Sequence, residues 1–599
     1  MLTARSAGWL SAMTAASAYV NAKFSVGIDL VQLRRDREWR SRLERRLLKA
    51  GDNCTLFGMF DTVDPGSEAL WFEGRTWTYG RLKTEANRFA HVLASNGVTT
   101  GDFVALFTTN SPEMIIALLA VSRLGAVAAL LNTNLRDETF AHCMDVSRAE
   151  YLISTPDLAP LITRDIRHFT LNVSSFTEAR ALAPNIKFID LNDTFHVEID
   201  HDPTPRSPAD LAVLIFTSGT TGKPKACAVK NMQLFVASNP ISQDTDDPGK
   251  YYPLRIYSSL PLFHGTALFA GFSYTVGSSG TLCLRRKFSA SSFWKDVAES
   301  NATRMLYIGE LCRYLLASPL SPYDKAHRCI VANGNGLRRE IWEEFKSRFG
   351  VAEIREFYRS TEGLGRALER DTFIIRVDTD TSQPWRDLKT GLCVLAKLDE
   401  AGEVIGRVRD RGLLTEYLGN KAATEEKLIH DVLKKGDCFQ RMGYLAVQES
   451  SGWVRFHDRV GDSFRWKGEN VSAGEVRDLI CEIRNVRDAI VFGVVLKGAA
   501  VVTLRRRTAG EEATFVQEVY RELHQKGLPS YAFPRLLRIS SSIGTGVTFK
   551  HGKREESKKG WNPAAIGHAD DALYWLNGTV YKKLGVESWM DIEAGRARL

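Results

Sequence analysis

The strongest constraint on the fold is an alternation of strand-like and helix-like apolar segments. Phe103–Phe107 is an uninterrupted apolar run of strand length, Glu113–Leu124 has the pattern of an apolar helix, and Ala126–Leu131 resumes a strand. Strand, helix and strand at this spacing are typical of parallel strands joined by crossover helices. The sequence therefore predicts an α/β fold built on parallel sheets.

The pattern changes to shorter strands and helices around Arg459–Asp462. A chain of 599 residues accommodates about two to four domains. We expect an N-terminal amphipathic segment over residues 1–55, a large domain over 56–459, and a small C-terminal domain with its tail over 460–599.

The composition limits the classes of partner that we expect for this chain. The net charge of +8 is a mild excess that permits attraction to anionic nucleotides or acidic lipids. No Lys/Arg stripe interleaved with aromatic residues is present, so we expect no nucleic-acid partner. The nine cysteines form no C-x-x-C pair and no zinc spacing, which indicates reduced core thiols and no structural metal.

Near the N-terminus, Gly8–Leu33 contains Asn21, Lys23 and Asp29 and is too polar for a membrane span. It also lacks the pattern of a signal peptide. Leu33–Leu48 is rich in arginine with leucines at helical spacing. Two interpretations remain, an interfacial helix on a membrane or an amphipathic helix packed on the domain, and the second is favoured.

The sequence ends in Ala597-Arg598-Leu599, which has the chemistry of a tripeptide read by the peroxisomal import receptor. We therefore expect a peroxisomal location, with the cytoplasm or a peripheral membrane site as alternatives.

The apolar strand Leu211–Phe216 runs into Thr217–Lys225, a loop rich in Ser, Thr and Gly, and a helical stretch follows over Val229–Ala237. Glycines allow close backbone approach, and successive N–H groups and hydroxyls can surround phosphate oxygens, to which Lys225 adds a positive charge. The spacing differs from a Walker A motif. The alternative to a phosphate loop is a flexible polar turn.

Several segments together resemble one family. Thr217–Lys225 resembles the phosphate loop of AMP-forming adenylating enzymes, such as acyl-CoA synthetases, and Glu356–Gly363 resembles their adenine and magnesium motif. Phe464–Ser472 (FRWKGENVS) is similar to the signature of the fatty acid transport protein and very-long-chain acyl-CoA synthetase branch, as are Asn333–Arg338 and Gly412–Asn420.

The resemblance implies the adenylating-enzyme fold, with a large N-terminal domain of parallel sheets and a small mobile α+β C-terminal domain. It implies a ligase in which a carboxylate attacks the α-phosphate of ATP, giving acyl-AMP, before the CoA thiol takes the acyl group. ATP, Mg²⁺ and coenzyme A are the cofactors implied. A carrier protein is a less favoured acceptor.

The resemblance and the residue chemistry together assign the nucleotide site. Tyr358 offers an aromatic face to adenine, Thr361 reaches the α-phosphate as a catalytic residue, and Glu362 is a hard oxygen ligand for Mg²⁺. The predicted ATP/AMP-binding residues are Thr217, Ser218, Gly219, Thr220, Thr221, Gly222, Lys225, Asn335, Tyr358, Ser360, Thr361 and Arg459.

The roles of four residues follow from the resemblance. His264 stands beside the acyl carboxylate as a gate or orienting group, with a satisfied core histidine as the alternative. Arg459 contacts ribose and phosphate, with a surface salt bridge as the alternative. Gly461 and Asp462 lie where the interdomain hinge is expected.

Lys550 is the predicted catalytic lysine that stabilises the first transition state, since its charge sits on a long mobile stem. Lys553, Lys558 and Lys559 lie close enough in sequence for the assignment to shift, and a basic surface loop is the remaining alternative.

Two positions depart from the family pattern. Tyr444 stands where the family has an aspartate that accepts hydrogen bonds from both ribose hydroxyls, and Asp437 is a distant substitute. The segment 493–500 is shorter than in the branch. The leading hypothesis is an acyl-CoA ligase for a long or very long acyl chain or a specialised carboxylic acid. The alternative is a catalytically weakened fatty acid binding or transport protein.

Overall fold

The computed structural model describes residues 26–155, 157–162, 167–170, 203–217, 224–337, 339–357, 371–378, 383–450, 454–459, 464–466, 469–471, 473–494, 497–526, 528, 532–543, 556–557, 559–564, 570–594 and 597. The chain divides into two compact units. The first comprises residues 1–306 and 326–330, and the second comprises 307–325 and 331–599.

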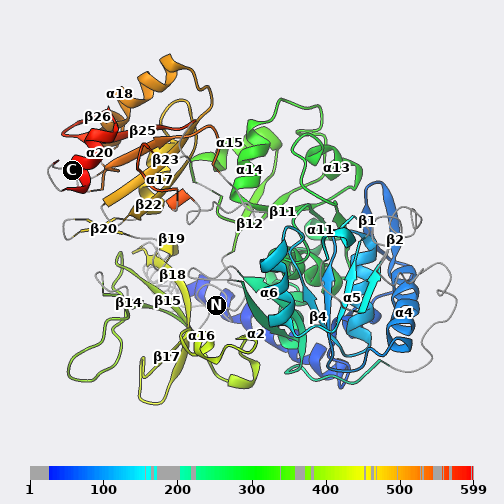
Figure 1. Cartoon of the computed structure of the whole chain (residues 1–599). Helices are drawn as coiled ribbons and strands as arrows, with labels where there is room; N and C mark the ends of the chain where they lie inside the picture. Colours follow the sequence, from blue (N-terminus) through cyan, green and yellow to red (C-terminus); the bar gives the residue numbers. More distant parts are fainter. Residues whose placement is uncertain are drawn as a thin grey trace, which may run out of the picture. The chain divides into compact units, whose positions relative to one another are not determined.

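The first unit contains the predicted parallel sheet (Figure 1). Within this unit its strands run in the order β8-β7-β4-β3-β5-β6. All neighbours are parallel except β7 and β8, which are antiparallel. The strands are β3 (Phe103–Phe107), β4 (Val127–Leu130), β5 (Tyr151–Ser154), β6 (Arg167–Thr170), β7 (Leu211–Thr217) and β8 (Lys225–Lys230).

A second sheet in this unit has the order β11-β9-β10-β1-β2, with only β2 antiparallel to its neighbour. Its strands are β1 (Glu68–Phe72), β2 (Arg75–Thr78), β9 (Arg255–Ser258), β10 (Thr281–Leu284) and β11 (Arg304–Ile308). The helices of the unit are α2 (Val26–Ala50), α3 (Leu56–Asp61), α4 (Tyr79–Ser95), α5 (Pro112–Arg123), α6 (Asp137–Ser147), α9 (Asn231–Ser238), α10 (Ser242–Asp246), α11 (Pro248–Tyr251), α12 (Tyr274–Gly277), α13 (Phe293–Glu299) and the π-helix η2 (Thr266–Ser273).

Helices α4 and α5 connect the two sheets of this unit. Helix α5 begins where the Ser111 hydroxyl accepts the N–H of Met114 at 3.2 Å, with Pro112 in the first turn, a strong start signal. It is apolar on nearly every side because it contacts β3 and β4 as well as α4, which in turn contacts β1 and β2. The apolar pattern of Glu113–Leu124 is therefore the pattern of a helix buried between layers.

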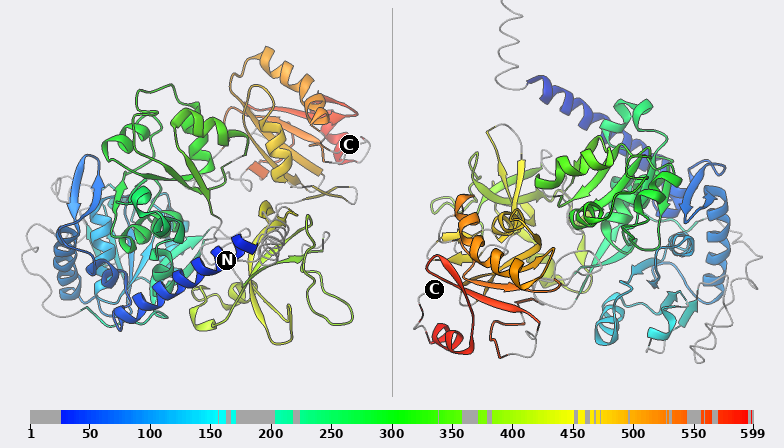
Figure 2. Two further views of the ribbon diagram at one scale, coloured as in Figure 1. Left: turned by 180° about the vertical axis from the view of Figure 1, so that it is seen from behind. Right: turned by 90° about the horizontal axis from the view of Figure 1, so that it is seen from above.

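Helix α2 packs on the first unit and is visible in dark blue in both views of Figure 2. Asn239 donates to the carbonyl of Trp39 at 2.9 Å, and Ser242 donates to the carbonyl of Arg35 at 3.2 Å. The Arg35 guanidinium pairs with Asp246 at 2.7 Å. The packed amphipathic helix is thus observed, and it is longer than the arginine-rich segment from which it was predicted.

The second unit begins with two parallel strands, β12 (Val331–Asn335) and β13 (Glu353–Glu356), accompanied by α14 (Gly309–Ala317) and α15 (Arg339–Phe349). An antiparallel sheet follows in the order β14-β15-β18-β17, with β19 paired to β18. It comprises β14 (Thr372–Arg376), β15 (Ala401–Arg407), β17 (Leu428–His430), β18 (Cys438–Gln448) and β19 (Val454–Arg459). The short elements β16 (Glu416–Tyr417) and α16 (Lys421–Glu425) precede β17.

The C-terminal sheet is covered on both faces. Its order is β22-β23-β24-β25-β26, with β23 and β24 parallel, and a separate hairpin of β20 (Phe464–Trp466) and β21 (Glu469–Val471) precedes it. Alternate residues of β22 face two cores, one shared with α17 and α18 and the other with α20. The elements are α17 (Ala473–Cys481), β22 (Val486–Val494), β23 (Lys497–Leu504), α18 (Ala509–Gln525), β24 (Leu536–Ile539), β25 (Ala572–Asn577), β26 (Val580–Lys583) and α20 (Val586–Glu593).

The shortened segment 493–500 coincides with the turn between β22 and β23. Gly493 pairs with Gly498 and Val494 pairs with Lys497, so the ladder continues to the end of both strands, and residues 495–496 lie outside the described residues. The shortening is therefore compatible with a complete sheet. The predicted boundary at residue 459 is not tested by the division into units and stays a prediction.

The nine cysteines are free thiols, seven of them buried and two half-buried. The burial of seven thiols agrees with the expectation of core residues. In the part of the chain that the structure describes, no helix has the length and apolarity needed to cross a membrane.

Candidate nucleotide and acyl site

The two ends of the predicted phosphate loop are joined by strand pairing. Thr217, the last residue of β7, lies opposite Lys225, the first residue of β8, in the antiparallel ladder. The Thr217 hydroxyl lies 3.6 Å from the sulfur of Cys227. Both Thr217 and Lys225 are half-buried, while residues 218–223, including Ser218, Gly219, Thr220, Thr221 and Gly222, lie outside the described residues.

The predicted helical stretch Val229–Ala237 corresponds to α9 (Asn231–Ser238), but the strand between it and the loop was not predicted. Strand β8 intervenes, and α9 begins only at Asn231. The run from Lys225 to Lys230 has a central apolar stretch that suits a buried strand as well as a helix, and pairing with β7 decides between them. The phosphate loop is therefore a hairpin connection.

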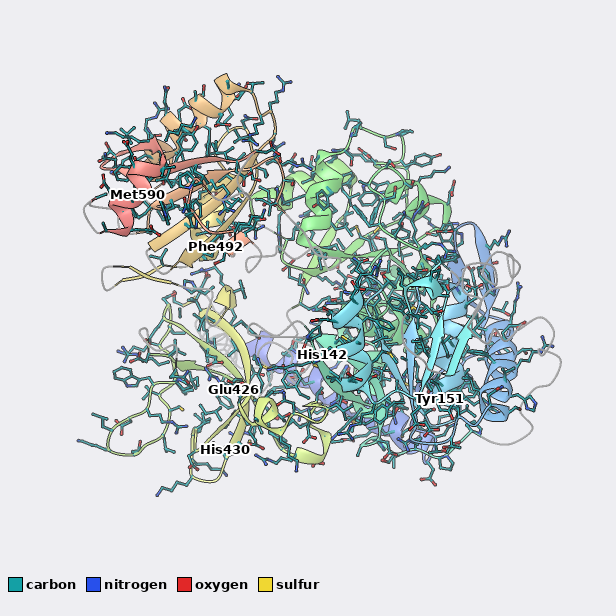
Figure 3. The ribbon with its side chains drawn as sticks, in the orientation of Figure 1. His142, Tyr151, Glu426, His430, Phe492 and Met590 are labelled. Carbon is teal, nitrogen blue, oxygen red and sulfur yellow. The ribbon has the colours of Figure 1, made fainter. Side chains whose placement is uncertain are left out.

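His142 supports the end of this loop and was not predicted. It lies on α6, and its Nε2 donates to the carbonyl of Pro224 at 2.9 Å (Figure 3). Pro224 immediately precedes Lys225, so the contact fixes the backbone where the loop returns to the sheet. Nothing in the sequence signals this pairing, because 82 residues separate the two partners.

The predicted adenine side is organised by Glu356 in the second unit. Its carboxylate accepts the N–H of Gly336 at 3.0 Å and the N–H of Leu337 at 2.9 Å. The hydroxyl of Tyr307 donates to the same carboxylate at 2.6 Å. Glu356 thereby fixes the turn that follows Asn335, a predicted nucleotide ligand that ends β12.

Close backbone packing explains the glycines of this turn. Gly336 has a φ of +74°, which other residues rarely adopt. A Cβ on Gly334 would collide with the carbonyl of Tyr307, and a Cβ on Gly309 would collide with the carbonyl of Gly336. Glu356 lay within the motif recognised from sequence, but its role depends on these contacts.

The phenol of Tyr307 is fully buried. Burial raises the pKa of Tyr307, and the negative charge of Glu356 raises it further. The hydroxyl therefore stays protonated and donates its hydrogen bond over the ordinary pH range. Tyr358, Ser360, Thr361 and Glu362, which follow Glu356 in the chain, lie outside the described residues.

His264 lies immediately before the π-helix η2. Its N–H donates to the carbonyl of Pro261 at 3.0 Å, and its own carbonyl accepts the N–H of Leu268 at 3.1 Å. The residue is half-buried. π-Helical turns occur frequently at functional sites, so the setting fits the predicted role without testing it.

Asn110 holds the loop in front of His264. Its side-chain amide donates to the carbonyls of Leu260 at 2.9 Å and Arg285 at 3.0 Å, and its oxygen accepts the N–H of Leu262 at 2.8 Å. Asn110 is 3% exposed, and these three bonds satisfy a buried amide. This positioning residue was also missed, since its partners lie far away in the sequence.

Tyr444 is part of an apolar cluster. It is 5% exposed and packs with the side chains of Ile374, Val404, Met442 and Ala446 on one face of the antiparallel sheet. In the ladder it lies opposite Arg459, the predicted ribose and phosphate ligand, whose side chain is outside the description. The position where the family has an acidic group is thus occupied by a packed ring.

Asp437 does not offer a replacement carboxylate. Its oxygens accept the N–H groups of Val432 at 2.7 Å, Leu433 at 3.1 Å and Lys434 at 3.0 Å, and its residue is 6% exposed. Three backbone donors engage this carboxylate in stabilising a turn.

The remaining predicted residues, Lys550, Gly461 and Asp462, lie outside the described residues. One of the alternatives to Lys550 is engaged elsewhere. The ammonium of Lys559 lies 2.8 Å from Glu556, a buried carboxylate that also pairs with Arg538 at 3.2 Å. Lys559 is therefore held in an ion-pair network.

The chain is similar in sequence to a known enzyme family and to several of its members. Residues 61–398 match the family model of the AMP-binding enzymes. The chain is 35% identical over 547 residues to the long-chain fatty acid transport protein 2 of Rattus norvegicus, covering 86% of each chain. It is 33% identical over 549 residues to the medium/long-chain-fatty-acid–CoA ligase FadD6 of Mycobacterium tuberculosis, covering 85% of each.

A very long-chain fatty acid transport protein of Cochliobolus heterostrophus is 30% identical over 629 aligned residues, with 98% of this chain and 95% of the relative covered. Among solved structures, an anthranilate CoA ligase in complex with anthranoyl-AMP superposes with a TM-score of 0.67 at 17% identity, over 84% of this chain and 97% of the other. That likeness establishes the fold.

Proposed function

Because the chain belongs to the AMP-binding enzyme family, in its branch of fatty acid transport proteins and very-long-chain acyl-CoA synthetases, we propose that it activates a long or very long acyl chain or a specialised carboxylic acid of secondary metabolism. The proposed reaction uses ATP to form acyl-AMP and pyrophosphate, and then transfers the acyl group to coenzyme A.

The residues of this chain would act mainly by positioning and by stabilising charge. The loop between Thr217 and Lys225 would surround the β- and γ-phosphates, with His142 fixing its return to the sheet. Glu356 would hold the Asn335 turn against the nucleotide, and Thr361 would reach the α-phosphate. Lys550 would stabilise the charge that develops as the carboxylate attacks.

Mg²⁺ would be held by Glu362 together with phosphate oxygens, and it would neutralise negative charge on the leaving pyrophosphate. Among the described residues, no three Asp, Glu, His or Cys side chains gather into a cation cage. This fits an ion bound through one carboxylate and the nucleotide, which is how Mg²⁺ is commonly held.

The observation that carries the proposal is the pairing of Thr217 with Lys225. It closes the predicted phosphate loop at the end of a buried strand, within the region that matches the AMP-binding family.

A second candidate is a fatty acid binding or transport protein with weakened catalysis. The packed ring of Tyr444 and the engaged carboxylate of Asp437 favour it, since Tyr444 carries no carboxylate and that of Asp437 already accepts three backbone N–H groups. Loss of a charge-assisted hydrogen bond lowers nucleotide affinity by roughly tenfold to a hundredfold.

Measurement of pyrophosphate release separates the two. The full-length protein is incubated with ATP, Mg²⁺ and a panel of carboxylic acids, with and without coenzyme A. Acid-dependent release that rises with coenzyme A supports the ligase and identifies its substrate class. Pyrophosphate release that does not change when coenzyme A is added points to a carrier protein as the acceptor. No release across the panel from folded protein overturns the ligase in favour of the binding protein.

For location, we propose import into the peroxisome through Ala597-Arg598-Leu599, with peripheral membrane contact by the N-terminal segment as a further possibility. Exposed Leu30, Val31 and Leu33 on α2 support the membrane contact. The N–H of Ala597 donates to the carbonyl of Asp591 at 3.1 Å, so a receptor would have to release this contact. Microscopy of an N-terminally tagged chain with and without the tripeptide tests the import, and unchanged peroxisomal signal after its removal overturns it.

A further inference from the structure

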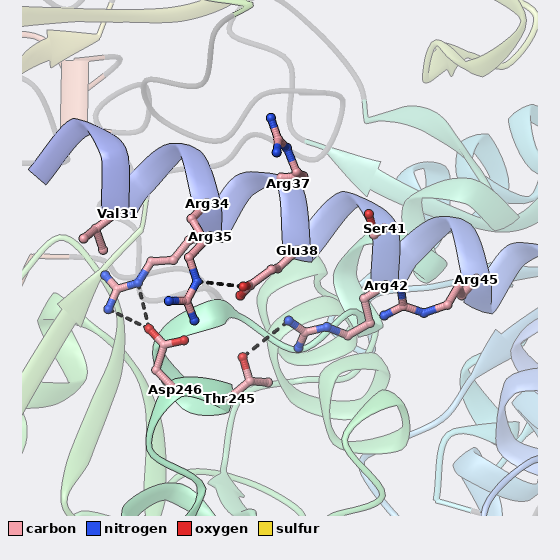
Figure 4. A pocket seen from close by; sticks show the side chains of 10 residues that line it. All are labelled: Val31, Arg34, Arg35, Arg37, Glu38, Ser41, Arg42, Arg45, Thr245 and Asp246. Carbon is pink, nitrogen blue, oxygen red and sulfur yellow. Dashed lines mark hydrogen bonds and ion pairs between the residues drawn. The ribbon is translucent and has the colours of Figure 1, made fainter. Parts of the chain in front are cut away.

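A groove rich in arginine runs along one side of α2, and none of its lining residues is assigned to the nucleotide or the acyl group. Figure 4 shows it between α2 and α10. Its volume is about 810 Å³, which lies within the usual range for small-molecule sites. The charged residues that line it are Arg34, Arg35, Arg37, Glu38, Arg42, Arg45 and Asp246.

The wall formed by α10 is rigidly anchored. Asp244 is completely buried and pairs with Arg304 at 2.7 Å, while the hydroxyl of Tyr274 donates to the same carboxylate. This buried contact holds α10 so that Thr245 and Asp246 face α2. Asp246 pairs with Arg35 at 2.7 Å, and the hydroxyl of Thr245 accepts a hydrogen bond from Arg42 at 3.3 Å. The groove is therefore preformed.

Positive charge in the groove exceeds negative charge. Glu38 pairs with Arg34 at 2.8 Å and Asp246 pairs with Arg35, so both carboxylates that line the groove are already in ion pairs. Among the described residues, Arg42 donates to the carbonyl of Pro240 and the hydroxyl of Thr245, each at 3.3 Å. Within the described ranges, no carboxylate lies within ion-pair distance of the remaining arginines, Arg37 and Arg45.

Neighbouring turns of α2 place like charges together. Arg42 lies three residues before Arg45 and four before Arg46, spacings at which like charges destabilise a helix. Burial lowers the pKa of Arg46, and the charge of Arg42 lowers it further. A bound anion would offset this repulsion, whereas the described part of the protein does not.

We propose that this groove binds an anion carrying two or more clustered phosphate groups, held by Arg37, Arg42 and Arg45. The planar guanidinium group binds phosphate oxygens in pairs, which makes arginine better suited than lysine to this ligand. Arg37 and Arg45 are separated by about 12 Å along the helix, a span that suits several phosphates on one scaffold. The source is a free polyphosphate or a phosphorylated lipid headgroup, and both present the same chemistry.

Two probes distinguish these sources in the full-length protein. Inositol hexakisphosphate represents the free anion, and phosphatidylcholine vesicles with and without phosphatidylinositol bisphosphate represent the headgroup. Affinity is measured by calorimetry for the first and by vesicle sedimentation for the second. Hydrogen exchange locates binding, and we expect slower exchange in residues 31–46.

The chain offers a matched control on the same helix. Arg37→Gln/Arg45→Gln removes two groove charges, while Arg40→Gln/Lys49→Gln removes two charges of α2 that do not line the groove. We expect the groove pair to weaken binding of the probe by about tenfold or more, since charge-assisted contacts are lost, and the control pair to bind like the parent protein.

Each outcome decides the proposal. Binding of the free probe that only the groove pair weakens supports it and identifies a soluble anion. The same pattern on vesicles alone supports it and identifies a headgroup. Equal weakening in both pairs, protection outside α2, or no binding of either probe overturns it. Pyrophosphate release is recorded on the same samples and should be unchanged in the groove pair, so the groove and the ligase activity are tested separately.

Discussion

Two antiparallel strand pairs end on residues predicted to contact the nucleotide, and their ends are built differently. In β7/β8, Thr217 and Lys225 lie opposite each other, half-buried and polar, at the mouth of the phosphate loop. In β18/β19, Tyr444 lies opposite Arg459, and its ring is buried in an apolar cluster. The end of β7/β8 carries polar residues, as expected for a phosphate loop, whereas the end of β18/β19 carries a packed ring where an aspartate was expected.

We expect phosphate binding and ribose binding to change separately, because the residues predicted for each contact lie on different pairs of strands. The substitution at Tyr444 also involves the stability of the antiparallel sheet. A test by reversion must therefore measure stability together with activity.

The largest effect is expected for Tyr444→Asp. A carboxylate placed in this apolar cluster would be buried without a described partner, which should destabilise the protein by about 3–5 kcal/mol. Urea denaturation measures the loss, and Tyr444→Phe, which keeps the ring, serves as the control. If Tyr444→Asp binds ATP more tightly at unchanged stability, the ring is not a structural requirement and the contrast between the strand pairs fails.

Lys550→Ala should reduce acyl-AMP formation by about 100- to 1,000-fold, as expected when a charge that stabilises the transition state is removed. Thioester formation from supplied acyl-AMP should be nearly unchanged. Separate assays of the two half-reactions check this, with Lys553→Ala as the neighbouring control. Equal losses in both half-reactions would contradict the assigned role.

Glu356→Gln tests the adenine side. The variant keeps the size of the side chain but replaces the charged acceptor of Gly336, Leu337 and Tyr307. Loss of a charge-assisted bond should raise KM for ATP by about tenfold, with KM for the carboxylic acid nearly unchanged. A general fall in kcat with both KM values constant would show that the Asn335 turn does not depend on this carboxylate.

His142→Ala should have a smaller effect, because it removes a single hydrogen bond to the carbonyl of Pro224. We expect KM for ATP to rise by about two- to tenfold. His430→Ala is the control, since His430 is an exposed histidine at the last position of β17. Equal changes in both variants would remove His142 from the phosphate side.

The smallest effect concerns pH. Burial and the adjacent Glu356 raise the pKa of Tyr307, so its contribution to stability is fully present below about pH 10 and is lost as the pH rises through the folded value. KM for ATP should therefore stay constant from about pH 8 to pH 9.5. A rise in this window that is absent in Tyr307→Phe would show that the phenol ionises earlier.

Much of the fold followed from local pattern. Phe103–Phe107 is a strand with the predicted bounds, and Glu113–Leu124 differs from α5 by one residue at each end. These segments are apolar throughout because they are buried on all sides, so their length and composition suffice. Strand β8 was missed because six residues with a short apolar centre fit either structure until a partner strand is known.

The strand ends that carry part of the candidate site could be predicted from contiguous motifs, whereas the roles of the residues there stay predictions. Thr217, Lys225 and Asn335 lie at the ends of β7, β8 and β12, where residues that follow buried strands are expected. His142, Asn110 and Tyr307 were not found, because each acts through a partner that folding alone brings near. The Asn110 amide reaches Leu260 across 150 residues, and no spacing rule detects such a pair.

The anchoring of the five-residue helix α10 affects which residues of the groove can change during evolution. Asp244 is fixed by Arg304 beneath it, while its neighbour Asp246 faces Arg35 on α2. Replacing Asp244 would leave a buried guanidinium without its ion-pair partner, whereas the arginines of α2 that line the groove are half-buried or exposed. We therefore expect homologues to keep the contacts that anchor α10 and to vary the arginines of α2. Such homologues would differ in the anion that the groove binds.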